Sequence, residues 1–203
     1  MYIVCFIVKQ RCALFLIACG AIVPTCTAQT TPEINAGSAG HEIEYYTAVG
    51  LGATIGTTNE TNWSAGVRFG WMLTDRRSDK LFSHRFEYAM DILPVFVNSQ
   101  KNGTGRGVEF DPAVLKWNYT PHRRLQPFLE LSFGIVETNI RIPPDDSRFN
   151  FTPSATAGVR ILCGRTDWSI GIRYLHFSNA YLEANNPGDD SIGIRIAISK
   201  WLK

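Results

Sequence analysis

The chain has 203 residues, of which 45% are hydrophobic and 12% aromatic, and its formal net charge is +2. This length suits one domain with a sizeable core, and no internal linker divides it. The near-neutral charge argues against a nucleic-acid partner and against an acidic tail. The four histidines lie far apart, without a Cys, Asp or Glu at a metal-ligand spacing, so we predict no structural metal.

Residues 1–28 have the parts of a secretory signal peptide. Basic residues up to Arg11 precede an apolar run over 12–23, and small residues follow up to Ala28. We predict cleavage after Ala28. The tetrapeptide LIAC at 16–19 also resembles a lipoprotein cleavage site, but it would leave a short apolar region after Arg11. Both modes of cleavage stay open.

A small-residue linker at 29–40 precedes a single β domain predicted for 41–203. Four of the five cysteines lie in the leader, so the exported chain keeps only Cys163. It cannot form an intramolecular disulfide, and its stability must come from other interactions.

From Glu42 onward the side chains alternate with a period of two, and no stretch is convincingly helical. In one segment, for example, Ile92 and Phe96 fall on an apolar face, whereas Glu87 and Asp91 fall on the opposite face. Eight such strands are predicted, at 43–55, 62–72, 82–97, 107–119, 125–140, 149–162, 167–178 and 190–202.

Eight amphipathic strands can form a soluble barrel or a membrane barrel, and the polar face decides between them. Here that face combines Gly, Ala and Ser with charged residues such as Arg68, Lys116 and Glu130. This mixture suits a narrow lumen, while the Ile, Leu, Val and aromatic face suits lipid. We therefore predict an all-β fold, an eight-stranded antiparallel transmembrane β-barrel of the outer-membrane type. A secreted soluble sandwich or lipocalin-like barrel shows similar alternation and is the alternative.

The connections orient this barrel if both chain ends lie in the periplasm. The longest connection then joins the last two strands at the cell-surface end. The chain finishes on Trp201 followed by Leu202 and Lys203, whereas outer-membrane strands commonly finish on an aromatic residue.

A candidate active site lies at this longest connection. By parity, His176 and Ser178 continue the outward face of their strand, and Asp190 shares the outward parity of Ile192. A carboxylate that orients a histidine, a histidine that takes a proton and a serine that attacks are the groups that acyl transfer needs. A His-x-Ser pair also arises by chance, as polar residues at a membrane rim.

The connection itself offers hydrogen-bond donors. Asn179, Asn186 and Gly188 could supply amide or backbone N–H groups to a developing oxyanion. Asn, Pro and Gly are equally the ordinary chemistry of a turn.

The segment RYLHFSNAYLEANNPGDDS, residues 173–191, resembles the signature of the lipid A 3-O-deacylase (PagL-like, acyloxyacyl hydrolase) family. The resemblance is carried by His176, Ser178 and the Asn-Ala that follows, then by Asn-Pro-Gly at 186–188. It implies an eight-stranded outer-membrane barrel that removes a primary ester-linked acyl chain from lipid A.

The resemblance also implies roles for individual residues. Ser178 would be the nucleophile, His176 the general base, and Asn179 or its neighbourhood the oxyanion donor. The family has a glutamate at the position of Asp190, so this acid is one methylene shorter and is expected to reach His176 less well. Glu183 and Asp189 are the other candidates for the acid, and the parity of Asp189 points it inward.

The implied partner is lipid A, or lipopolysaccharide, of the outer leaflet, for a membrane-embedded enzyme without a cofactor. A homodimer is left open. Lys101, Arg106 and Arg148 are candidates for contacts with lipid A phosphates, or are solvated loop charges. The alternative function is a non-enzymatic small outer-membrane barrel with a structural or adhesive role.

Overall fold

The computed structural model describes residues 40–53, 60–74, 84–101, 103–119, 124–144, 146–163 and 166–202. The predicted leader and nearly all of the predicted linker therefore lie outside the described residues. Within the described part, no helix is long and apolar enough to cross a membrane. The described residues form nine strands: β1 (His41–Gly52), β2 (Thr61–Met72), β3 (His84–Gln100), β4 (Gly103–Tyr119), β5 (Leu125–Ile142), β6 (Ser147–Phe151), β7 (Ser154–Cys163), β8 (Thr166–Phe177) and β9 (Asp189–Leu202).

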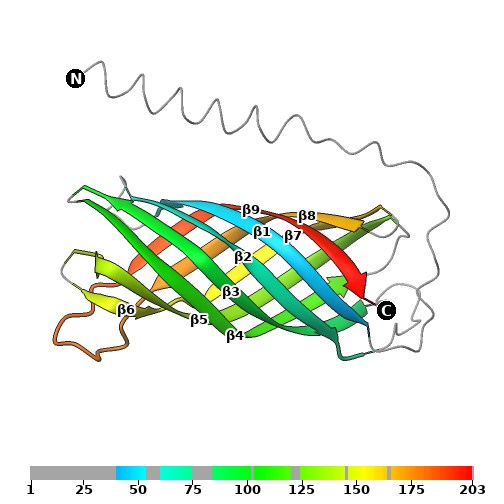
Figure 1. Ribbon diagram of the computed structural model, residues 1–203, viewed down its shortest axis with the longest axis horizontal. Helices are drawn as coiled ribbons and strands as arrows, with labels where there is room; N and C mark the ends of the chain where they lie inside the picture. The colour runs from blue at the N-terminus through cyan, green and yellow to red at the C-terminus, as the bar shows by residue number, and fades with distance from the viewer. Residues whose placement is uncertain are drawn as a thin grey trace, which may run out of the picture.

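These strands wind around one axis as a closed antiparallel barrel (Figure 1). The order of neighbours is β4-β3-β2-β1-β9-β8-β7-β5-β6, and β4 also pairs with β5 to close the sheet. Segments β6 and β7 follow one register along β5, in which Ile135 lies opposite Phe151 and Ser132 opposite Ser154. The break between them includes Pro153, which has no N–H to donate to a ladder. The nine segments therefore fill eight barrel positions, and the predicted eight-stranded barrel is confirmed.

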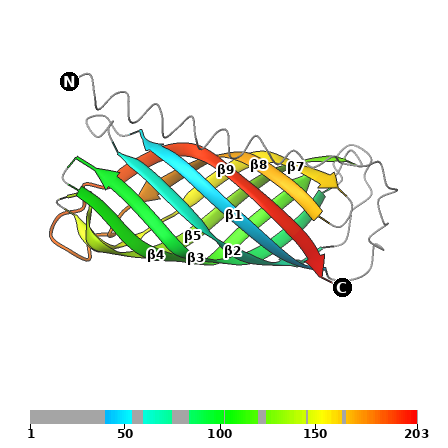
Figure 2. The same cartoon turned by 45° about the horizontal axis from the view of Figure 1, so that its top comes forward.

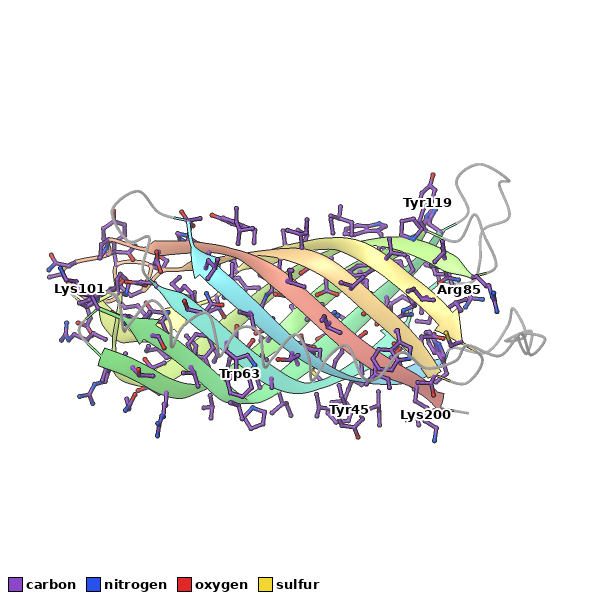
Figure 3. All side chains as sticks on the ribbon, turned by 90° about the horizontal axis from the view of Figure 1, so that it is seen from above. Tyr45, Trp63, Arg85, Lys101, Tyr119 and Lys200 are labelled. Carbon is purple, nitrogen blue, oxygen red and sulfur yellow. The ribbon has the colours of Figure 1, made fainter. Side chains whose placement is uncertain are left out.

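The predicted alternation of faces is visible along the strands. In β8, Ile170 and Ile172 are 50% and 65% exposed, whereas Ser169 and Arg173 are buried. Figure 3 shows Tyr45 at the outer surface of the barrel, pointing away from it. An exterior of exposed aliphatic and aromatic side chains around a polar, charged interior is typical of a membrane barrel, and a soluble barrel has the reverse arrangement.

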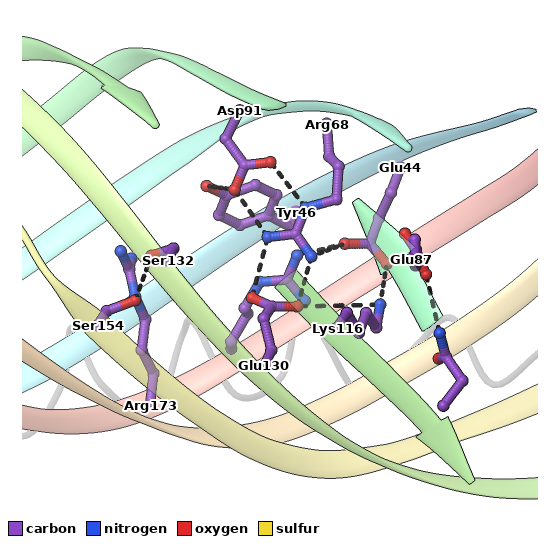
Figure 4. Close-up of polar contacts among 12 residues, drawn as sticks. Glu44, Tyr46, Arg68, Glu87, Asp91, Lys116, Glu130, Ser132, Ser154 and Arg173 are labelled. Atoms are coloured by element: carbon purple, nitrogen blue, oxygen red, sulfur yellow. Dashed lines mark hydrogen bonds and ion pairs between the residues drawn. The ribbon is translucent and has the colours of Figure 1, made fainter. Parts of the chain in front are cut away.

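A network of buried ion pairs centred on Arg68 fills the middle of the barrel (Figure 4). Arg68 Nε lies 2.7 Å from Asp91 Oδ1, and Arg68 Nη1 lies 2.5 Å from Glu130 Oε2. Lys116 Nζ lies 3.6 Å from Glu44 Oε2 and 3.9 Å from Glu130 Oε2. These five side chains come from β1, β2, β3, β4 and β5, one from each. Removing one partner would leave a buried charge uncompensated, so the network ties the strands together.

One predicted side-chain direction is wrong. The alternation predicts Phe96 on the apolar outer face, but Phe96 is 1% exposed and points inward. The register of β3 against β4 shifts between Leu93 and Phe96, which marks a β-bulge. An extra residue in one strand moves the side chains that follow to the other face. Inside the barrel, Phe96 joins an apolar cluster with Val136, Ile142, Leu175 and Phe177.

The two ends of the barrel differ (Figures 1 and 2). The connections β1–β2, β3–β4, β5–β6 and β8–β9 lie at one end, which we name the long-loop end. At the other end, the terminal end, His41 at the start of β1 pairs with Leu202 of β9. Figure 3 shows Lys101 at the long-loop end and Lys200 at the terminal end. At the long-loop end, the longest connection between strands is that of β8 and β9, residues 178–188.

Ile172 and Leu182 offer a matched test of the lipid-facing surface, since both are 65% exposed. Ile172 lies on the outer wall of β8, whereas Leu182 lies in the β8–β9 connection. We predict that Ile172→Arg lowers the free energy of unfolding in bilayers by about 2–4 kcal/mol, because a charge enters hydrocarbon. Leu182→Arg should change it by less than about 0.5 kcal/mol. Urea unfolding of the barrel in lipid vesicles measures both, and equal effects would contradict the assignment.

Candidate active site

His176 and Asp190 are direct partners across β8 and β9. Their Nδ1 and Oδ1 atoms are 2.7 Å apart, and their side chains are 37% and 36% exposed. Directly opposed residues have Cβ atoms about 5 Å apart, so the strand register alone brings this pair into contact. The expected shortfall in the reach of the aspartate is therefore wrong.

Ser178 lies on the same outward face, just beyond the last residue of β8. Its backbone N–H donates to the Phe151 carbonyl at 3.1 Å, and its carbonyl accepts from the Phe151 N–H at 2.7 Å. Its hydroxyl donates to Asn186 Oδ1 at 3.1 Å. Among the described residues the Ser178 hydroxyl makes no hydrogen bond to His176. Ser178, His176 and Asp190 thus share one face, with the serine held by the connection.

The chain reverses sharply after Ser178. Ala180 and Tyr181 have φ angles of 52° and 61°, in the left-handed region that non-glycine residues rarely adopt. The turn is closed by the Leu182 N–H, which donates to the Asn179 carbonyl at 3.0 Å, and the Ala180 N–H lies 3.2 Å from Ser178 Oγ. Such conformations cost of order 1–3 kcal/mol each and cluster at functional sites.

The two predicted asparagines are used differently. Asn186 Oδ1 accepts from both the Ser178 hydroxyl and the Asn179 backbone N–H, each at 3.1 Å. The Asn179 side chain is instead fully buried, and its Nδ2 donates to Asp146 Oδ1 and, at 2.6 Å, to the Asn185 carbonyl. Asn186 is therefore the predicted oxyanion residue whose side chain contacts Ser178, and the Asn179 amide is occupied elsewhere.

Gly188 packs the end of the connection against the histidine. Its φ is +65°, and a Cβ atom there would lie 3.3 Å from both His176 Cε1 and the Phe177 carbonyl oxygen. Any other L residue would be strained and would crowd the imidazole ring. Gly188 thus has a structural reason to be glycine, separate from its predicted role as a donor.

A second hairpin, β5–β6, contacts the β8–β9 connection. Asp146 in this hairpin is completely buried, and burial raises the pKa of its carboxyl group, against the hydrogen bonds from the Gly188 backbone and Asn179. Arg141 Nη1 donates to the Asp146 carbonyl at 2.7 Å and lies 3.0 Å from Glu183 Oε2. No pattern in the sequence pointed to Asp146, because only the fold brings the two hairpins together.

The alternative acids lie elsewhere. Glu183 is paired with Arg141 and accepts from Ser147 Oγ at 2.9 Å. Asp189 is 2% exposed and points into the barrel, as its parity predicted. Of the three carboxylates considered, Asp190 is the one bonded to His176.

Tyr174 is a further neighbour of the site, on the outward face of β8. Its hydroxyl donates to Asp190 Oδ1 at 2.5 Å. Its place two residues before His176 on the same face was the available signal. The basic residues Lys101, Arg106 and Arg148 are all exposed, on the β3–β4 and β5–β6 hairpins at the long-loop end.

Comparison with known families decides the relationship of this barrel. The family model for lipid A 3-O-deacylase (PagL) matches residues 82–199, which is more than half of the chain. The chain belongs to the lipid A 3-O-deacylase (PagL) family. The matched region includes all the predicted site residues, from His176 to Asp190.

A solved structure shows the same barrel fold. The crystal structure of the outer membrane enzyme PagL is 19% identical and aligns with a TM-score of 0.58 over 76% of this chain and 97% of that chain. Neisserial surface protein A (NspA) is 13% identical, with a TM-score of 0.48 over 79% of this chain and 96% of its own. OprG from Pseudomonas aeruginosa is 8% identical, with a TM-score of 0.42 over 81% and 96%. No curated protein matches the sequence significantly.

Behind the site of this PagL-family barrel, two carboxyl groups meet. Glu60, just before β2, is 8% exposed and lies beside Asp189. Burial, a hydrogen bond with Asp189 and repulsion from its charge raise the pKa of Glu60 to about 8 from 4.5. Glu60 therefore carries a proton at neutral pH.

The raised pKa of Glu60 predicts that the stability of the folded barrel depends on pH. Because the folded-state pKa of Glu60 is raised, its contribution is fully present below pH 4.5 and is lost as the pH rises through about 8. We expect the melting temperature of the wild type to fall between about pH 5 and 8, and that of Glu60→Gln to fall less. Thermal unfolding monitored by circular dichroism measures this, with Glu137→Gln on the exposed surface as the control. Parallel curves for wild type and Glu60→Gln would contradict the prediction.

Proposed function

We propose that this protein is an outer-membrane lipid A deacylase that hydrolyses an ester-linked 3-O hydroxyacyl chain. Membership of the PagL family supports the substrate class. The observation that carries the chemistry is the His176–Asp190 hydrogen bond of 2.7 Å beside Ser178, on the outer wall at the long-loop end. We propose a serine esterase mechanism with these three residues as nucleophile, base and acid.

In this mechanism Ser178 Oγ attacks the ester carbonyl carbon while His176 Nε2 takes the hydroxyl proton. Asp190 holds the other ring nitrogen, which fixes the tautomer and stabilises the imidazolium that forms. The Ser178 hydroxyl first exchanges its hydrogen bond with Asn186 for one with His176. Catalytic hydrogen bonds often form only once substrate is bound.

The tetrahedral intermediate then collapses and the bond to the sugar oxygen breaks. His176 returns its proton to this leaving oxygen, and the acyl chain remains on Ser178. A water molecule, deprotonated by His176, attacks the acyl-serine and releases the hydroxy fatty acid. No cofactor takes part in these steps.

The oxyanion is assigned to Asn186 in this proposal. Its side-chain amide already touches Ser178 Oγ, and rotation of the amide by half a turn presents Nδ2 in place of Oδ1. That rotation also breaks the acceptor contact with the Asn179 backbone N–H, so this N–H becomes a second donor. Asn179 would then act through its backbone, while Gly188 shapes the connection.

An outward site suits a substrate that is itself a membrane lipid. The ester of lipid A lies in the outer leaflet, just below the sugar head group, so a side chain on the outer wall can reach it. A site facing the lumen would meet the ion pairs around Arg68 instead. Exposed Lys101, Arg106 and Arg148 at the long-loop end are the candidates for the lipid A phosphates.

Ser178→Ala tests the proposed reaction directly. In a bacterium that makes lipid A with its 3-O chains intact, expression of the wild type should remove one hydroxyacyl chain, and Ser178→Ala should not. Mass spectrometry of extracted lipid A shows the difference. Ser99→Ala, the same change at an exposed serine of β3, should behave as wild type. Intact lipid A with the wild type would instead favour a structural or adhesive barrel.

We further propose that the leader directs export and that the long-loop end faces the cell surface. In a Cys163→Ser background, Leu182→Cys in the β8–β9 connection should react with a membrane-impermeant maleimide on intact cells. Lys200→Cys at the exposed terminal end should react only after the outer membrane is permeabilised. Labelling of Lys200→Cys alone on intact cells would reverse the orientation.

A further inference from the structure

Tyr174 donates its hydroxyl hydrogen to the same carboxylate oxygen that holds the histidine. The distance from Tyr174 Oη to Asp190 Oδ1 is 2.5 Å, and that from His176 Nδ1 to the same oxygen is 2.7 Å. Tyr174 and His176 lie two residues apart on the outward face of β8, and Asp190 faces them from β9. The side chains of Tyr174 and His176 therefore converge on one oxygen atom of Asp190.

Two donors on one oxygen restrict how the carboxylate can turn. The Asp190 side chain is 36% exposed, so water competes for its oxygens, and rotation about the Cβ–Cγ bond would carry Oδ1 away from the ring. Hydrogen bonds to a charged group are stronger than neutral ones, and two of them from one strand favour a single orientation. Both donors belong to β8, whose register against β9 is set by the backbone ladder.

We propose that Tyr174 is a positioning residue of the deacylation reaction, which fixes Asp190 so that Oδ1 stays on His176 Nδ1. The inference rests on the proposed function. Tyr174 touches none of the reacting atoms. It acts through Asp190, and so keeps His176 Nε2 directed at Ser178.

A tyrosine on the outside of a membrane barrel also has a simpler role, as an anchor at the lipid interface. That role depends chiefly on the ring, which phenylalanine retains. Tyr174 is 44% exposed, and Tyr45, on the outer wall towards the terminal end, is 58% exposed. Removing the hydroxyl from each residue in turn separates positioning from anchoring.

The experiment compares Tyr174→Phe, Asp190→Ala, the double variant and Tyr45→Phe in detergent micelles containing lipopolysaccharide. Release of hydroxy fatty acid gives kcat and KM. We expect Tyr174→Phe to lower kcat about 10-fold with KM unchanged, the loss of one hydrogen bond to a charged group. In the Asp190→Ala background the same change should have no further effect, because its partner is gone. Tyr45→Phe should retain the wild-type kcat.

Wild-type kcat in Tyr174→Phe, or an equal loss with and without Asp190, would overturn the inference. A second measurement does not depend on activity: the NMR signal of the His176 Nδ1 proton should broaden in Tyr174→Phe and not in Tyr45→Phe. An unchanged signal would also count against positioning. If the signal broadens but the wild type releases no fatty acid, the proposed function fails while the positioning contact stands.

Discussion

The ion-pair network around Arg68 is the interaction on which the rest of the structure depends. Arg68 is bonded to Asp91 and Glu130, and the strands that carry them pair with other strands around the closed barrel. Charges of this kind are tolerated without water only where they are paired, so the polar face of each strand must turn inward. The other face of each strand is then left for lipid. The direction of every side chain on the outer wall follows from what the interior must hold.

The outward direction of the candidate site follows from this separation of a polar interior from a lipid-facing exterior. His176 and Ser178 follow the outward side chains of β8, and Asp190 precedes those of β9. Neither strand needs an irregular backbone to bring His176 and Asp190 together, since they are direct partners in the ladder. Polar side chains on the outer wall would be costly in hydrocarbon, and these lie at the long-loop end of the barrel, away from the middle of its outer wall. In the proposed reaction, that is also where the substrate ester lies.

Much of this could be predicted from the sequence because strand side chains repeat with a period of two. Counting by twos gave the eight strands, their faces and the shared direction of His176, Ser178 and Asp190. It failed at Phe96, since a bulge between Leu93 and Phe96 changes the parity without a mark in the pattern. It could not foresee contacts between hairpins.

Contacts between side chains from different parts of the barrel were not predicted from the sequence. Asp146 and Asn179 are 33 residues apart in the sequence, and they are in contact because the β5–β6 hairpin packs against the β8–β9 connection. The bond from Tyr174 to Asp190 crosses just two neighbouring strands, 16 residues apart, and parity already put both on one face. The contact between Asp146 and Asn179 can be found only from the fold. The contact between Tyr174 and Asp190 could have been predicted from the sequence, because both residues have outward parity on neighbouring strands.

The candidate site has one half fixed by the sheet and one half fixed by the connection. His176 and Asp190 are paired in the β8–β9 ladder, next to its last pair, Phe177 and Asp189. Ser178 contacts Asn186 within the connection, and further local bonds hold the connection in place, among them the one from Asn179 to Asp146. Local opening costs less free energy than global unfolding. In the proposed reaction, a fully folded barrel with an open connection would keep its histidine and acid paired but lose the surroundings of its nucleophile, so activity follows the state of the connection more closely than the stability of the barrel.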